Sequence, residues 1–139
     1  MEKKLEKLDW TPDMSVGVRT FDEQHKRVIL MINRLIDVLS ATTNSQEVAD
    51  MLDKMTKYTS EHLREEESLM AQHGYPLFEQ HKAEHVAYIK KTVDFCTATQ
   101  IGVDGIAQGL LIFLRSWWEH HIQNSDKAYS TFFNGIGIS

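Results

Sequence analysis

Helical periodicity in four long stretches is the sequence feature that most restricts the fold of this chain. Apolar residues recur three and four positions apart in segments covering about residues 20–40, 44–72, 76–98 and 104–123, a spacing that places them on one face of an α-helix. In the first segment, Val28, Ile32, Leu35 and Leu39 form such a stripe. We therefore expect four helices, each burying one face against the others.

Short joints with turn residues separate the four segments. The joints contain the stretches ATTNSQ, HGYP and QIGVDG, and we place Pro76 at the first helical position of the third segment. Helices joined by short loops run antiparallel to their sequence neighbours. The sequence predicts an all-α fold, an up-down-up-down antiparallel four-helix bundle with an N-terminal arm over residues 1–19 and a short C-terminal helix or tail.

The size and charge of the chain narrow its class. Its 139 residues suffice for one hydrophobic core, so we expect a single domain over residues 1–139. The net charge of -5 argues against nucleic acid as a partner, because nucleic-acid-binding proteins present clustered Lys and Arg. Neither a signal peptide nor an apolar run of the roughly 18 residues needed to cross a membrane is visible. We therefore expect no membrane partner. Because Cys96 is the single cysteine and cannot form an internal disulfide, we also expect a cytoplasmic protein.

Histidines and carboxylates occur at helical spacing near one end of the predicted bundle. His62 and Glu66 are four residues apart in the second segment, and His81 and His85 are four apart in the third. Residues four apart share a helix face, so each pair could bind a metal. His25 lies near the start of the first segment, which an antiparallel bundle places at the same end as these pairs.

The end of the fourth segment adds two more candidates, His121 and Asp126. Convergence of five histidines and two carboxylates predicts a metal site, because buried polar groups without partners are unfavourable. One step in this pattern is irregular: a five-residue spacing is about 140° out of phase on an ideal α-helix. The helix must therefore end or loosen near Gln123 to Ser125 for both groups to face inward.

Four motifs together resemble the hemerythrin family, in its single-domain bacteriohemerythrin type. They are QHK, HLREEESLM, GYPLFEQHKAEH and WWEHHIQNSDKAY, and they extend over nearly the whole chain. The resemblance implies two iron ions in an oxo- or hydroxo-bridged di-iron centre. In that family pattern one iron is ligated by His81, His85 and His121, the other by His25 and His62, and both are bridged by Glu66 and Asp126.

The implied ligand set leaves one coordination position open. Two octahedral irons offer about twelve positions, and five imidazoles, two bridging carboxylates and one bridging oxygen fill about eleven. The resemblance implies that dioxygen binds reversibly at the open position, on the iron with two histidines, for transport, storage or delivery and without enzymatic activity. The expected wall of the dioxygen pocket consists of Val28, Leu63, Trp117, Trp118 and Ile122. The family usually has Phe at Leu63 and a smaller aliphatic residue at Trp118, so bulk is exchanged across the pocket.

Two other functions remain open. An oxygen or redox sensor would signal to a protein partner, with the C-terminal stretch STFFNGIGIS as a possible docking element. A di-iron oxidase is disfavoured, because such enzymes use carboxylate-rich sites with Glu-x-x-His motifs and no histidine in this sequence follows a glutamate at that spacing. We expect Glu65 and Glu67 to face solvent, and we exclude His73 and His120 from the site.

Overall fold

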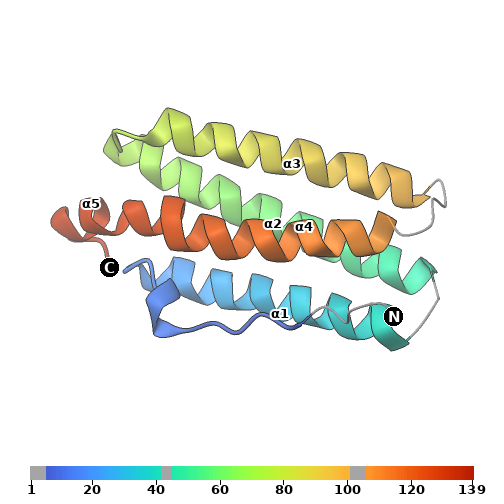
Figure 1. Ribbon diagram of the computed structural model, residues 1–139. Coiled ribbons are helices and arrows are strands. Elements are labelled where there is room, and N and C mark those ends of the chain that lie inside the picture. Colours follow the sequence, from blue (N-terminus) through green and yellow to red (C-terminus); the bar gives the residue numbers. More distant parts are fainter. Residues whose placement is uncertain (1–5, 42–44, 101–105) are drawn as a thin grey trace.

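Four long helices form the body of the protein. The computed structural model describes residues 6–41, 45–100 and 106–139, and its helices alternate in direction along the chain (Figure 1). Each helix packs against two neighbours, in the cyclic order α1, α2, α3, α4. The described ranges contain helices and turns but no strand, so the predicted all-α four-helix bundle is confirmed. The bounds are α1 (Arg19–Ala41), α2 (Ser45–His73), α3 (Phe78–Gln100) and α4 (Ile106–His121).

Shorter elements extend the bundle at both ends of the chain. The N-terminal arm contains a 3-10 helix, η1 (Pro12–Met14), and runs alongside α1 before the chain turns back into that helix (Figure 1). The arm is tied down by a reciprocal pair of hydrogen bonds: Leu8 N–H donates to Asn33 Oδ1, and Asn33 Nδ2 donates to the Leu8 carbonyl, both at 2.9 Å. After α4 follow a π-helix, η2 (Ile122–Asp126), and α5 (Ser130–Gly135), the expected short C-terminal helix.

The turn between α2 and α3 differs from the prediction by two residues. Gly74 adopts a left-handed φ of 69°, Tyr75 N–H donates to the Met70 carbonyl at 2.9 Å, and Gly74 N–H donates to the Ala71 carbonyl at 3.4 Å. This is a Schellman motif, which pairs the last carbonyls of a helix. The next residues complete a turn, so α3 begins at Phe78 and the placement of Pro76 at its first position is wrong. The expected starts at residues 44 and 104 lie outside the described residues.

The bundle interior divides into an apolar part and a polar part. Leucine and isoleucine side chains such as Ile32, Leu35 and Leu114 are at most 2% exposed, and each contributes about 1.5–3 kcal/mol by leaving water. The polar part lies at the end where α1 and α3 begin and holds histidines and carboxylates that are also buried. The apolar part must therefore offset the desolvation of an unusual polar interior.

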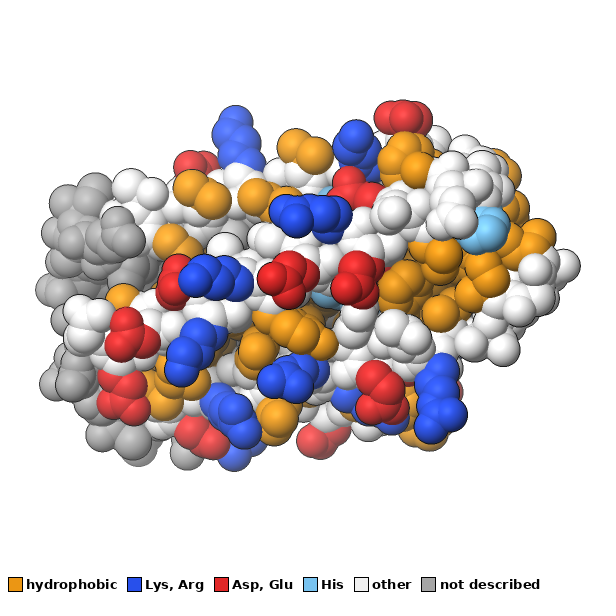
Figure 2. All heavy atoms as spheres, turned by 180° about the vertical axis from the view of Figure 1, so that it is seen from behind, with side chains coloured by type: hydrophobic (Ala, Val, Ile, Leu, Met, Phe, Trp, Pro, Cys, Tyr) orange, Lys and Arg blue, Asp and Glu red, His pale blue; other side chains and the backbone are white. Residues whose placement is uncertain are grey.

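The surface carries charges of both signs. In Figure 2, which views the molecule from behind, Lys and Arg side chains are interspersed with Asp and Glu over the visible face rather than gathered into a basic patch. None of the described helices combines the length and the apolar character needed to span a membrane.

Candidate metal centre

Seven polar side chains meet in the polar part of the interior. They come from all four long helices and from η2, and none is more than 4% exposed. The structure thus brings together every candidate ligand from the sequence: His25, His62, Glu66, His81, His85, His121 and Asp126. It leaves the two excluded histidines, His73 and His120, exposed to solvent.

The seven side chains form two overlapping groups of possible metal ligands. In one group, His81, His85 and His121 join the two carboxylates. In the other, His25 and His62 join the same two carboxylates. Within each group the candidate ligand atoms lie within 4.8 Å of one another. Three nitrogens on one side and two on the other are the division expected from the family pattern.

Each carboxylate presents one oxygen to each group. Glu66 Oε2 lies 3.2 Å from the Nε2 atoms of both His25 and His62, whereas its Oε1 lies 3.5 Å from His85 Nε2. Asp126 divides its oxygens in the same way, with Oδ2 at 3.1 Å from His25 Nε2 and Oδ1 at 3.0 Å from His121 Nε2. This arrangement suits two carboxylates that bridge a pair of cations.

Several of these buried atoms lack hydrogen bonds within the described structure. Glu66 Oε1, both carboxylate oxygens of Asp126 and His81 Nε2 have no hydrogen-bond partner there. An unpaired buried polar group costs about 1–3 kcal/mol, and more when it is charged. Atoms that point at one another without hydrogen bonds are suited to coordinate cations placed between them, as the two groups allow.

The spacing of the ring nitrogens also fits metal coordination. His25 Nε2 lies 3.0 Å from His62 Nε2, and His85 Nε2 lies 3.1 Å from His121 Nε2. Two ligands at right angles on a metal, with bonds of about 2.1 Å, are about 3.0 Å apart, whereas tetrahedral ligands would be further apart. The donor set therefore fits a pair of octahedral cations.

The π-helix η2 explains how Asp126 reaches the site. The i to i+5 hydrogen bonding of a π-helix compensates the five-residue step from His121. The expected loosening after His121 is confirmed, although α4 itself ends at His121 rather than at residue 123. Single π-turns within helices are rare and frequently occur at functional sites.

Partners of the second ring nitrogen fix two of the histidines. His62 Nδ1 lies 2.5 Å from Gln24 Oε1, and His121 Nδ1 lies 3.0 Å from Glu84 Oε2. Partners such as Gln24 and Glu84 orient metal-binding histidines and raise their basicity. Sequence reasoning did not find them. Glu67 lies near a third ring, with a carboxylate oxygen 3.4 Å from His85 Nδ1, but no hydrogen bond joins the two.

The neighbouring acids Glu65 and Glu67 lie outside both ligand groups, as expected. Glu67 faces solvent only in part, because its side chain is 22% exposed and packs beside His85. Glu65 is exposed as expected, and its carboxylate accepts a hydrogen bond from Gln24 Nε2 at 2.5 Å. Gln24 therefore connects this surface acid to the ring of His62.

Tyr129 is a further buried contact that sequence reasoning missed. Its hydroxyl donates to Glu66 Oε2 at 2.7 Å, and its ring stacks beside His81 with centroids 5.8 Å apart. Burial, followed by the nearby carboxylates Glu66 and Asp126, raises the pKa of Tyr129 well above its usual value, so the hydroxyl remains a donor. The only sequence signal was the tyrosine three residues after Asp126, in the stretch DKAY.

In the metal-free site, burial and neighbouring charges shift the pKa values of individual histidines and carboxylates in different directions. Burial alone would lower the pKa of His25 and His81, but the carboxylates of Asp126 and Glu66 outweigh it and raise these values to about 9 and about 10. Burial lowers the pKa of His85 to about 3. The surrounding histidines overcome burial at both carboxylates and hold the pKa of Glu66 and of Asp126 below the usual range.

The expected pocket-wall residues lie in two places. Val28, Leu63, Trp118 and Ile122 are fully buried, and Trp118 lies beside the two-histidine group, with ring centroids 5.8 Å from His62 and 6.4 Å from His25. Its indole Nε1–H donates to the Tyr88 hydroxyl at 3.0 Å.

Trp117 lies elsewhere than expected. It is half-buried and stacks on His121 at 4.2 Å, in the three-histidine group. Adjacent helical residues point about 100° apart, so two consecutive tryptophans cannot both face the two-histidine group. The prediction that Trp117 lines the pocket wall beside the open position is therefore wrong.

A four-helix bundle with two histidine groups sharing two buried carboxylates defines a class of proteins that bind metal ions inside the bundle. Residues 16–132 match the sequence model of the family described as Hemerythrin HHE cation binding domain. The chain belongs to the hemerythrin family, whose members bind non-haem iron.

Individual relatives and a solved structure agree with this family. A bacteriohemerythrin of Stenotrophomonas maltophilia (strain R551-3) is 34% identical over 123 residues, which cover 88% of this chain and 79% of that protein. A bacteriohemerythrin of Methylococcus capsulatus is 33% identical over 123 residues, covering 88% and 93%. A crystal structure of wild-type hemerythrin superposes with a TM-score of 0.82 at 33% identity, covering 88% of this chain and 95% of that one.

Proposed function

We propose that this protein binds two iron ions and, through them, dioxygen reversibly, as an oxygen carrier, storage or delivery protein and not as an enzyme. The observation that carries the proposal is the pair of overlapping ligand groups with shared carboxylates. In this proposal His81, His85 and His121 hold one iron, His25 and His62 hold the other, and Glu66 and Asp126 bridge them. The iron pair, when bound, supplies the redox chemistry by which dioxygen is held and released.

The difference between the two groups supports a single dioxygen position. Three imidazoles serve one side of the site and two serve the other, so the open position belongs to the side of His25 and His62. Trp118 packs beside these two rings, and its only polar atom is turned to Tyr88. The indole therefore presents apolar surface, which excludes water from that side of the site.

The donor set favours binding over substrate oxidation. Five nitrogen donors and two carboxylates make this site richer in nitrogen than the carboxylate-dominated sites of ferritin-like di-iron proteins. Tyr129 and the partners of the His62 and His121 rings bond to the proposed ligands and orient them, and the raised pKa of Tyr129 keeps its hydroxyl a hydrogen-bond donor to Glu66. We infer a protein that holds dioxygen rather than one that turns over a substrate, and a cytoplasmic location suits its lone thiol, Cys96.

A sensor is the second candidate, favoured by one specific contact. Tyr129 donates to Glu66 and is also the residue that precedes α5. A change at Glu66 would therefore reach the C-terminal helix directly, where a protein partner could detect it. An oxygen-dependent change in proteolysis after Tyr129 would support this role, whereas identical digestion with and without oxygen would exclude it.

Metal analysis and absorption spectra test the main proposal. We expect about two irons per chain and a spectrum that changes when the reduced protein meets air and reverts under vacuum. Glu66→Ala and Asp126→Ala should each lower iron occupancy far more than the matched surface variants His73→Ala and His120→Ala. One metal per chain, preferential zinc binding at matched supply, or equal losses in all four variants would contradict the proposal.

A further inference from the structure

A groove between α3 and η2 reaches the candidate metal centre from the surface. Its volume is about 230 Å³, and its wall includes His81, one of the proposed iron ligands. A cation in this groove would therefore lie beside a proposed ligand. The groove is lined by Tyr75, Leu77, Gln80, His81, Glu84, Asn124, Ser125 and Ala128.

Solvent reaches the proposed ligands on this side of the bundle. The side chains of His81 and His121 are each 3% exposed, whereas those of the other five ligands are at most 1% exposed. His81 borders the groove itself, and His121 Nδ1 lies 3.0 Å from Glu84 Oε2 in the groove wall. The two least buried of the seven side chains thus both lie beside this groove.

A hydrogen bond crosses the groove. Ser125 Oγ on η2 donates to Glu84 Oε2 on α3 at 2.5 Å, and the same carboxylate oxygen is the partner of His121 Nδ1. The Glu84 side chain is 47% exposed, so it extends from solvent to the ring of a proposed ligand. When the bond from Ser125 opens, a cation from solvent can bind to Glu84 next to His81 and His121.

The charge of the groove suits a cation. Its wall contains one acid, Glu84, and neither Lys nor Arg. The protonated ring of His81 is balanced by Asp126, whose Oδ1 lies 2.9 Å from His81 Nε2. Because charged clefts attract ions of the opposite sign, the carboxylate of Glu84 favours a divalent cation at the mouth of this groove.

Two other grooves near the centre are less suitable for a cation. One borders Gln24 on α1, and the other borders Glu67 on α2. Basic side chains outnumber acidic ones in both, so both oppose the approach of a divalent cation. The charged residues are Arg19, Lys26, Arg27 and Arg34 with Glu23 in the first groove, and Arg64 and Lys82 with Glu67 in the second.

We propose that ferrous iron enters and leaves the centre through the groove between α3 and η2. Glu84 binds it first, because carboxylate oxygens bind hydrated divalent cations, and the imidazoles of His81 and His121, which suit iron, then replace Glu84. The hydrogen bond from Ser125 to Glu84 is the contact that must open. This inference rests on the iron binding proposed above, but it concerns the rates of filling and emptying rather than the affinity.

Kinetics of iron uptake and release test the role of Ser125. The metal-free full-length protein is mixed anaerobically with ferrous iron, and uptake is followed by the fluorescence of Trp117 and Trp118, which lie beside the ligand rings. Release is followed by the absorbance of a ferrous chelator in excess. Ser125→Ala should accelerate uptake and release alike, by about three- to tenfold, because one hydrogen bond no longer holds the groove closed. The equilibrium affinity should stay within about twofold of the original.

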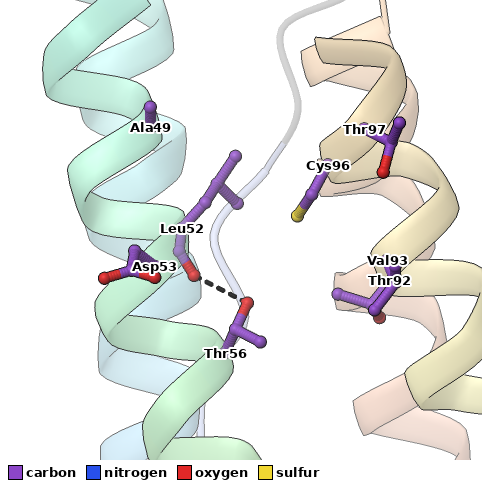
Figure 3. A pocket seen from close by; sticks show the side chains of 8 residues that line it. All are labelled: Ala49, Leu52, Asp53, Thr56, Thr92, Val93, Cys96 and Thr97. Atoms are coloured by element: carbon purple, nitrogen blue, oxygen red, sulfur yellow. Dashed lines mark hydrogen bonds between the residues drawn. The ribbon is translucent and has the colours of Figure 1, made fainter. Parts of the chain in front are cut away.

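Filling the groove should have the opposite effect. Ala128 is exposed at the groove, and Ala128→Trp should slow both rates by about fivefold or more, because the indole occupies the space through which the ion passes. The matched control is Thr97→Trp. Thr97 lies at the exposed edge of a separate pocket between α2 and α3, shown in Figure 3, which contains none of the proposed ligands. Thr97→Trp should leave both rates unchanged.

An added charge tests the electrostatic part of the argument. Gln80→Lys places a positive charge at the exposed mouth of the groove and should slow uptake by about threefold or more at low salt. The effect should vanish near 1 M salt, where the Debye length is about 3 Å. Thr20→Lys adds the same charge at the groove beside α1 and should change uptake much less.

Parallel changes in both rates support the proposal. Unchanged rates in Ser125→Ala and Ala128→Trp, a change in release alone with a matching loss of affinity, or equal effects of the control variants would overturn it. Iron content at equilibrium reports on the proposed function separately. Two irons per chain with unaltered kinetics in the variants would refute this route alone, whereas a protein that takes up no iron would refute both proposals.

Discussion

Replacing Trp118 by Leu should loosen the wall beside the two-histidine group. Trp118 is fully buried and donates its only polar hydrogen to Tyr88. The exchange removes roughly 60 Å³, which at about 24 cal/mol per Å³ of cavity amounts to ~1.4 kcal/mol. Loss of the hydrogen bond to Tyr88 adds about 1 kcal/mol. Trp118→Leu should therefore destabilise the protein by about 2–3 kcal/mol and admit water, which speeds autoxidation.

The sequence predicts that Leu63 and Trp118 exchange side-chain volume across the pocket, and a second mutation, at Leu63, tests this prediction. Leu63 follows His62 on α2 and is fully buried, as is Trp118 beside the His62 ring. Leu63→Phe alone should overpack this region and destabilise it by about 1–3 kcal/mol. If the two side chains share one space, the double variant recovers at least 1 kcal/mol of the summed losses and regains slow autoxidation.

Urea unfolding of the metal-free protein and the autoxidation rate of the oxygenated protein measure this cycle. Trp117→Leu with Leu63→Phe is the matched control, because Trp117 stacks on His121 in the other histidine group. Losses in Trp118→Leu and Leu63→Phe that add within about 0.5 kcal/mol would show that the side chains do not meet. The argument for a compensated pocket would then be refuted, whereas the proposed ligand set would be untouched.

Further predictions concern the proposed ligands and their partners. The raised pKa values of His25 (about 9) and His81 (about 10) mean that both are protonated in the metal-free protein at pH 7.5, so calorimetry in buffers of different ionisation enthalpy should detect release of about two protons on metal binding. Since these values exceed that of an unfolded histidine, their contribution to metal-free stability is complete below about pH 6.5 and is lost as pH rises through 9 to 10. Tyr129→Phe removes the hydrogen bond to Glu66 and should lower metal-free stability by about 1.5–3 kcal/mol in urea unfolding. Glu84→Gln should weaken metal binding by about tenfold in chelator competition, because the partner of a ring nitrogen loses its charge.

Each of these has an outcome that would contradict it. Buffer-independent heats would show that the two histidines bind metal without losing protons. Unchanged stability in Tyr129→Phe would mean that its hydroxyl contributes nothing to the buried carboxylate. For Glu84, the exposed acid Glu61 provides a matched control, and equal effects of Glu61→Gln and Glu84→Gln would indicate a general change in surface charge.

The fold was predictable because its determinants are local. Apolar spacing identifies the helices, and a joint such as HGYP forces the chain to reverse, so the bundle follows from residues close in sequence. The precise start of α3 was not predictable in the same way. Proline suits the first turn of a helix, but it also suits the turn that completes the Schellman motif at Gly74, and only the backbone hydrogen bonds distinguish the two.

The sequence reveals the proposed metal ligands but not the residues that hydrogen-bond to them. Spacings of four residues, such as His62 to Glu66, fix which side chains share a face. The partners of the rings depend instead on how far each helix is rotated about its own axis relative to its neighbours, and sequence spacing does not carry this information. Glu67 illustrates the difference, since it adjoins Glu66 in sequence yet packs beside His85 on another helix.

Asp126 shows how a local irregularity can itself be a signal. Its five-residue distance from His121 conflicts with α-helical geometry, so either one group faces away or the helix changes its hydrogen bonding. The π-helix resolves this conflict at Ile122–Asp126. It also carries Tyr129, three residues later, into contact with the opposite carboxylate, Glu66. The π-helix thus positions one proposed bridging ligand, Asp126, and also Tyr129, the hydrogen-bond donor to the other bridging ligand, Glu66. An ordinary α-helical turn would bring neither Asp126 nor Tyr129 to these places.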